Sequence, residues 1–182
     1  SKVKVRKRRK NQDPFETLGL GKGLVWNKLW RREFILNNNL KFCEGASRGE
    51  DTIFNDLSIP LICKTVIDDN ALYCYRRNRE GSLMNTSEAD GKKKLDSYLI
   101  LVDHFIDNSQ KINYDGSDDW KLDVVIELSH DAIVKFIKND EDIKNYSVKS
   151  LNLVNKFLEI NKMTPNEHYQ KCIDHLHQMA EN

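Results

Sequence analysis

The chain has 182 residues, with 29 lysines and arginines against 28 aspartates and glutamates, so its formal net charge of +1 indicates no particular class of partner. The length is sufficient for one domain with a hydrophobic core. No apolar run approaches the roughly 18 residues that cross a membrane, and the basic start lacks the apolar segment of a secretory signal. We therefore expect a cytoplasmic protein.

The four cysteines show no C-x-x-C pair, and a disulfide framework is not expected in a chain of this size. They are predicted to be small core residues in a reducing compartment. The positions are Cys43, Cys63, Cys74 and Cys172.

Residues 1–22 form a basic tail and a glycine-containing loop. Val3 and Val5 lie between basic residues, which predicts a solvated tail or an edge strand, with contact to anionic lipid or nucleic acid as the alternative. No aromatic residue interleaves the basic run, and we expect no nucleic-acid partner. The glycines near residue 20 lack G-x-G-x-x-G spacing, so residues 11–23 are predicted to be a flexible loop.

Residues 24–36 are predicted to form a helix, because Trp26, Leu29 and Trp30 follow three- and four-residue spacing. A turn of three asparagines ends it. A second helix is predicted to begin at Glu50, after a loop bracketed by glycines. The dipole of that helix favours ionised carboxylates at its N-terminus, which predicts a low pKa there.

Residues 61–67 are rich in apolar and β-branched side chains, which predicts a strand. Residues 71–75 are predicted to form a second strand. The turn between them, residues 68–70, allows the two strands to pair as a hairpin. Residues 76–86 are polar and contain glycine, which predicts a loop.

Residues 91–182 are predicted to be a helical region of about four helices. Apolar stripes mark helices within residues 92–106 and 120–138. An acidic linker is predicted over residues 139–145, followed by a helix capped by Ser147. The sequence Thr164-Pro165-Asn166-Glu167 is typical of a capping box and predicts that Thr164 caps the last helix.

Four sequence segments resemble the second half of the catalytic domain of family-two inverting glycosyltransferases, which have the GT-A fold. In this chain they read V-W-N-K-L-W-R-R-E-F from Val25, L-K-F-C-E-G from Leu40, E-D-T-I-F-N from Glu50, and Y-C-Y-R-R-N-R-E-G-S from Tyr73. The resemblance covers roughly residues 20–90. It implies an α+β chain in which residues 23–90 are the acceptor-side part of a GT-A domain.

The resemblance also implies roles for individual residues. Asp51 matches the catalytic base, which takes the proton from the acceptor hydroxyl, and Glu50 helps to bind the acceptor. Separately, the planar guanidinium group suits phosphate oxygens, so one or two of the arginines at 76, 77 and 79 are expected to hold the nucleotide diphosphate, with a solvated charged loop as the alternative. Trp26 could either stack on a sugar or lie in the core, and both alternatives stay open, whereas Trp30 is expected in the core. The proposed substrate-binding residues are Trp26, Asn27, Lys28, Arg76, Arg77 and Arg79.

In the family, the nucleotide-binding half of the GT-A domain precedes these segments and carries an Asp-x-Asp metal motif. We therefore expect a divalent cation, Mg²⁺ or Mn²⁺, in the complete enzyme but no ligands for it in this chain. The expected substrates are a nucleotide-sugar donor and a glycan or lipid-linked acceptor of surface polysaccharide synthesis, used at the inner face of the membrane. The alternative is a non-catalytic helical interaction module that retains a GT-A remnant.

Two further clusters contain residue types that bind metals. His168, Cys172 and His175 lie on one face of the last predicted helix, but the sequence offers no evident fourth ligand. The acidic cluster at residues 115–119 follows the acceptor-side segments, so it cannot take the place of the Asp-x-Asp motif and is expected to be a solvated turn.

Overall fold

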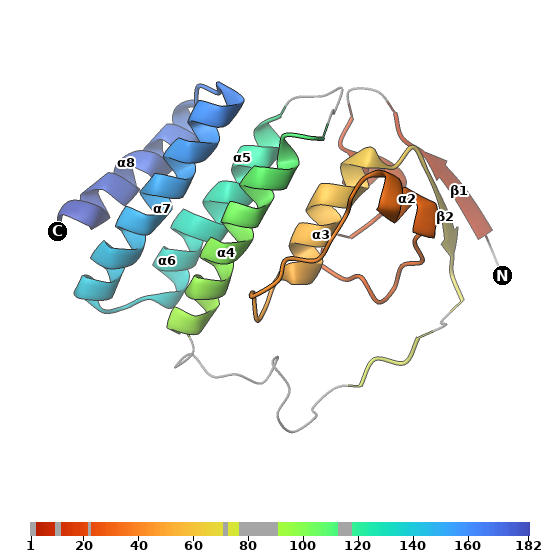
Figure 1. Cartoon of the computed structure of the whole chain (residues 1–182), viewed down its shortest axis with the longest axis horizontal. Helices are drawn as coiled ribbons and strands as arrows, with labels where there is room; N and C mark the ends of the chain where they lie inside the picture. Colours follow the sequence, from red (N-terminus) through yellow and green to blue (C-terminus); the bar gives the residue numbers. More distant parts are fainter. Residues whose placement is uncertain (1–2, 10–11, 22, 71–72, 77–90, 113–117) are drawn as a thin grey trace.

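The computed structural model of the chain describes residues 3–9, 12–21, 23–70, 73–76, 91–112 and 118–182. It is mostly helical, with one small antiparallel sheet of two strands, and it belongs to the α+β class. Figure 1 shows the sheet at one end of the long axis, α3 and α4 in the middle, and α7 and α8 at the other end.

The elements follow one another in this order. They are β1 (Val3–Lys7), α1 (Pro14–Leu18), α2 (Arg32–Asn37), α3 (Glu50–Ser58), the 3-10 turn η1 (Ile59–Leu61), β2 (Lys64–Asp68), α4 (Gly91–Ser109), α5 (Asp119–Ile126), the π-helical turn η4 (Glu127–Asp131), α6 (Ala132–Phe136), α7 (Asp140–Asn161) and α8 (Glu167–Glu181).

The sheet pairs two segments that lie far apart in the sequence. β1 and β2 are antiparallel, with Val5 opposite Val66. The basic start is therefore a strand, one of the two structures expected for it. The predicted hairpin is wrong, because β2 pairs with β1 and residues 73–76 form no strand; residues 71–72 lie outside the described part of the chain.

The predicted flexible loop before residue 24 contains a short helix. The Asp13 side chain caps α1 by accepting from the backbone N–H groups of Phe15 and Glu16, and Pro14 occupies the first turn. Gly19 ends the helix in the left-handed conformation. Phe15 and Leu18 then pack against Ile59 in a small apolar cluster separate from the main core.

The predicted helix over residues 24–36 is wrong for most of its length. Only α2 is helical, whereas residues 24–31 run as turns and irregular chain. Leu29, which belonged to the predicted apolar stripe, is 99% exposed. The helix predicted at Glu50 is confirmed as α3.

One continuous core joins α3 to the helical region. Ile53 and Leu57 of α3 belong to the same buried cluster as Leu101 and Phe105 of α4, and as Phe157 of α7. A pair of hydroxyls, Ser47 Oγ and Ser97 Oγ, lies 2.8 Å apart across the same junction. The expected helical region is confirmed: α4, the α5–η4–α6 run, α7 and α8 follow the predicted order.

Three predicted details of the last two helices are wrong. The acidic residues at 140–142 are the first turn of α7 and not a linker, because the Asn139 side chain caps the helix and carboxylates are favoured at this end. Ser147 is buried inside α7. Asn166, and not Thr164, caps α8 by accepting from Tyr169 N–H at 3.1 Å.

The cysteines are less buried than expected. Cys43 is buried and Cys172 is half-buried, but Cys63 and Cys74 are exposed, so the core prediction is wrong for these two. Within the described residues, none of the helices has both the length and the apolar character that crossing a bilayer requires.

The entry to α3 makes a close backbone contact with α4, which gives a stability prediction. Gly49 has φ +87°, and a Cβ atom there would lie 2.8 Å from Leu101 Cδ1. Gly45 has a similar φ of +85°, but no atom lies within 4 Å of its Cβ position. Both alanine variants therefore carry the left-handed strain of about 1–2 kcal/mol, and only Gly49→Ala adds an overpacking cost of about 1–3 kcal/mol.

We expect urea unfolding to show that Gly49→Ala is less stable than Gly45→Ala by about 1–3 kcal/mol, the overpacking cost. Equal stability of the Gly49→Ala and Gly45→Ala proteins would contradict the close contact between Gly49 and Leu101.

Candidate functional site

The site is organised around the first turn of α3, which begins at Glu50 directly after the left-handed Gly49. The Asp51 carboxylate accepts a hydrogen bond from the backbone N–H of Val25. One turn further along α3, Asn55 Nδ2 donates to the backbone carbonyl of Leu24 at 3.3 Å. Residues four apart share one helix face, so α3 holds the backbone of residues 24–25 at two successive positions.

The contact at the Leu24 carbonyl competes with helix formation at the start of residues 24–31. The Leu24 carbonyl also accepts from the Lys28 ammonium group, and Val25 N–H is bonded to Asp51. Side chains thus occupy backbone groups at the start of the segment, and the chain turns there.

Lys28 is the cation of this site. Its ammonium group also donates to Asn27 Oδ1 at 3.1 Å. Partial burial lowers the pKa of Lys28, while the negative charge of Asp51 acts in the opposite direction. The charge on Lys28 therefore faces the Asp51 carboxylate across the turn.

The Asp51 pKa is raised, and the prediction of a low pKa at the helix N-terminus is wrong. Burial makes the largest contribution, because it disfavours the charged form, and the neighbouring Glu50 carboxylate adds to it. The Val25 N–H and Lys28 lower the Asp51 pKa and only partly offset these effects. A raised pKa makes Asp51 a better proton acceptor than an exposed aspartate once it is ionised.

Trp26 lies beside this turn and forms an aromatic cluster with residues from the fourth resemblance segment. Its ring stacks on Tyr73 with centroids 4.7 Å apart and on Tyr75 with centroids 5.1 Å apart. Tyr73 and Tyr75 are 55% and 47% exposed, so this cluster is open to solvent. Trp26 is thus a partly exposed aromatic residue and not a core residue.

Trp30 turns the other way, toward α3. Its ring meets Phe54 edge-on, with centroids 5.5 Å apart, and Phe42 stacks on the same Phe54 ring. These rings line an open apolar hollow of about 330 Å³, which Trp26 borders. The lining residues are Val25, Trp26, Trp30, Ile35, Leu40, Phe42 and Phe54.

The structure thus brings together most, but not all, of the predicted site residues. Glu50, Asp51, Trp26 and Lys28 surround one turn, and Asn27 is exposed on its outer side. Arg76 follows Tyr75 and is exposed. Arg77 and Arg79 lie outside the described residues.

His168, Cys172 and His175 of α8 do not form a metal-binding cluster. His175 Nδ1 lies 3.0 Å from Nε2 of His130, whose Nδ1 contacts Asp131 at 2.6 Å. The described ranges contain no group of three or more potential ligands arranged to hold a metal ion. The described residues therefore do not fit the divalent cation that the resemblance implies, and no chemical step here uses one.

Sequence reasoning missed the residues that support Asp51. Val25 and Asn55 act through a backbone N–H and an amide across the fold, which leaves no pattern in the sequence. Tyr73 and Tyr75 did have a signal, since both lie in the fourth resemblance segment, directly before its arginines.

The charges around Asp51 predict opposite pKa changes in two variants. Glu50→Gln removes a charge that raises the Asp51 pKa and is expected to lower it. Lys28→Met removes a charge that lowers the Asp51 pKa and is expected to raise it. Carbon-13 NMR titration of the carboxyl groups measures both shifts, and shifts of the same sign would contradict this arrangement.

Comparison with family models, with curated proteins and with solved structures found no match for this chain.

Proposed function

We propose that this chain supplies the acceptor side of an inverting glycosyltransferase with a GT-A-like fold. The supporting observation is that segments far apart in the sequence meet at Asp51. Val25 and Lys28 come from the first resemblance segment, Asp51 comes from the third, and Tyr73 and Tyr75 of the fourth reach the site through Trp26.

In this proposal Asp51 is the base. Its carboxylate takes the proton of an acceptor hydroxyl while that oxygen attacks the anomeric carbon of the donor sugar. A bond forms between the acceptor oxygen and the anomeric carbon. The bond from that carbon to the donor phosphate oxygen breaks, and the nucleoside diphosphate leaves with the electron pair. Attack opposite the leaving group inverts the anomeric configuration.

The residues around the base have separate tasks. The Trp26 ring offers an apolar face on which a sugar ring of the acceptor stacks. Glu50 and Asn27 contribute polar atoms toward acceptor hydroxyls, and the Lys28 charge favours the ionised form of Asp51. Arg76, with Arg77 and Arg79, is proposed to meet the donor diphosphate, since guanidinium groups bind phosphate oxygens through paired hydrogen bonds.

The donor sugar, most of its nucleotide and the cation are proposed to bind groups outside the described residues. The acceptor is a glycan or lipid-linked sugar of surface polysaccharide synthesis, and we place the reaction in the cytoplasm at the inner face of the membrane.

A specific observation also favours the second candidate, an interaction module. Val3, Val5 and Val66 are 56%, 57% and 62% exposed, and Val5 and Val66 are paired across the sheet. Apolar side chains grouped on an exposed sheet are typical of contact surfaces. A pure interaction module would not require Asp51 or Trp26 for its activity, which separates the two candidates.

Glycan binding tests the acceptor site without the donor. Trp26→Ala removes a stacking face worth about 0.5–1.5 kcal/mol beyond its buried area, so the affinity is expected to fall by at least about 2- to 13-fold. The purified chain is screened on an array of bacterial polysaccharide fragments, and the affinity for the best glycan is then measured by calorimetry.

The matched control is Leu29→Ala, because Leu29 lies in the same segment and is 99% exposed. This variant is expected to bind like the native chain. No glycan binding, or equal loss in both variants, would contradict the acceptor site.

A further inference from the structure

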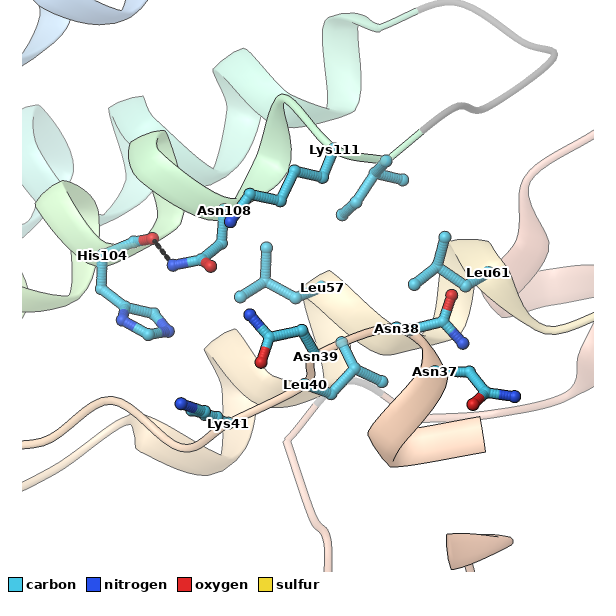
Figure 2. A pocket seen from close by; sticks show the side chains of 11 residues that line it. Asn37, Asn38, Asn39, Leu40, Lys41, Leu57, Leu61, His104, Asn108 and Lys111 are labelled. Atoms are coloured by element: carbon cyan, nitrogen blue, oxygen red, sulfur yellow. Dashed lines mark hydrogen bonds between the residues drawn. The ribbon is translucent and has the colours of Figure 1, made fainter. Parts of the chain in front are cut away.

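A second cavity lies at the other end of α3, away from Asp51. It has a volume of about 270 Å³ and opens between the turn that follows α2 and the C-terminal half of α4. In Figure 2, Asn108 and Lys111 lie along the α4 side, Asn39 and Lys41 line the opposite side, and Leu57 lies between them. An apolar floor with several convergent polar groups is typical of a small-molecule site.

The charged side chains that line the cavity are all positive. Lys41 and Lys111 line it, and none of its eleven lining residues is an aspartate or glutamate. The nearby carboxylates of α4 are engaged elsewhere: Asp103 and Asp107 lie 2.7 and 3.2 Å from Lys156 Nζ of α7. No ion pair joins either cavity lysine to a described residue, so both ammonium groups can bind an anion.

The other polar groups that line the cavity are uncharged, so they are better suited to bind hydroxyl groups than charged groups. Burial lowers the pKa of His104, so its ring is neutral at pH 7, although Asp107, Asp103 and a hydrogen bond to the Lys41 backbone raise that pKa. One ring nitrogen donates to the Lys41 carbonyl, which leaves the other as an acceptor. Asn108 Nδ2 donates to the His104 carbonyl at 2.8 Å, so its amide oxygen is available as an acceptor.

The turn that carries Asn39 is also suited to a ligand. Asn39 has φ +49°, in the left-handed region that asparagine tolerates better than most residues. The preceding Asn38 is tied to the end of α2, since its Nδ2 donates to the Phe34 carbonyl at 2.8 Å. The backbone of this wall is therefore fixed, and the Asn39 amide extends from it into the cavity (Figure 2).

We propose that this cavity binds a small phosphorylated polyhydroxy compound, such as a sugar phosphate. Lys41 and Lys111 bind the phosphate group, while Asn39, His104 and Asn108 bind the hydroxyl groups. This site is independent of the proposed transfer reaction, because it lies at the opposite end of α3 and none of its polar lining residues belongs to the Asp51 site.

Calorimetry and proton–nitrogen NMR of the purified chain test this proposal with three probes: glucose 6-phosphate, glucose and inorganic phosphate. We expect glucose 6-phosphate to bind at least tenfold more tightly than either of the others and to shift the signals of Asn39, Lys41 and Asn108. Its affinity is expected to fall with added salt, because ammonium–phosphate attraction is screened.

Three variants test which side chains bind the phosphate group and which bind the hydroxyl groups. The double change Lys41→Met with Lys111→Met is expected to abolish glucose 6-phosphate binding, whereas Lys138→Met, at an exposed lysine outside the cavity, leaves it unchanged. Asn39→Gly keeps the backbone conformation and is expected to weaken glucose 6-phosphate but not inorganic phosphate. Circular dichroism verifies that each variant is folded.

Retention of binding by the double lysine variant would overturn the proposal. Equal affinity for glucose 6-phosphate and inorganic phosphate, or no binding of glucose 6-phosphate, would also overturn it.

Discussion

Phe105→Ala is expected to destabilise the chain by about 3–5 kcal/mol, the usual cost of emptying a large buried aromatic site. Phe105 is 0% exposed and lies on α4, at the centre of the core that joins α3 to the later helices. Its ring meets Trp120 of α5 edge-on, with centroids 5.8 Å apart, so the variant also loses an aromatic contact between two helices.

Urea unfolding followed by circular dichroism measures this loss. Ile100→Ala is the matched control, because Ile100 lies on the same helix and is 41% exposed, and its cost is expected to be much smaller. A Phe105→Ala protein as stable as the control would contradict the central place of Phe105 in the core.

Sequence periodicity predicted α4 well because a long amphipathic helix repeats its signal. Leu95, Leu101, Val102, Phe105 and Ile106 are all buried on one side, and several turns of agreement outweigh any single exception. The same argument failed over residues 24–31, where the apolar stripe had few members. There Trp26 turns toward Tyr73, Trp30 turns toward Phe54, and Leu29 is exposed.

The predictions of the sheet and of the helix caps failed for a different reason. The partner of β2 is β1, about sixty residues earlier, and neither strand carries a signal that names the other. At α8, Thr164 and Asn166 are both residue types that cap helices and lie within three positions of each other, and Asn166 is the one that caps the helix.

The candidate site was predicted in part. The resemblance pointed to Glu50, Asp51, Trp26 and Lys28, and these residues surround one turn in the structure. The Asp51 pKa was predicted in the wrong direction, because the helix dipole is visible in the sequence whereas burial against residues 24–28 is not. The support from Val25, Asn55 and the two tyrosines likewise arises only from the fold.

Asp51→Asn is expected to have the largest effect on transfer. Asparagine has the same shape and keeps an oxygen that can accept from Val25 N–H, but it cannot take a proton from the acceptor. General base catalysis contributes about 10²–10⁴-fold, so the turnover number is expected to fall by that factor while acceptor affinity changes little. Glu159→Gln removes an exposed carboxylate on α7 and is expected to leave turnover unchanged.

The pH dependence follows from the same group. Asp51 acts as a base only when ionised, so the rate is expected to fall as the pH drops through its raised pKa. Glu50→Gln lowers that pKa, and the acid limb of the rate profile is therefore expected to move to lower pH. Loss of the acid limb in Asp51→Asn would assign it to Asp51.

The most direct measurement is the transfer rate of the protein expressed from its complete native gene. Radiolabelled uridine and guanosine diphosphate sugars are supplied with Mn²⁺ and the acceptor glycan found by array screening. The proposal predicts transfer by the native and Glu159→Gln proteins and a loss of at least about 10²-fold in Asp51→Asn, with acceptor binding retained. Transfer by Asp51→Asn at the native rate would contradict the assignment of Asp51 as the base.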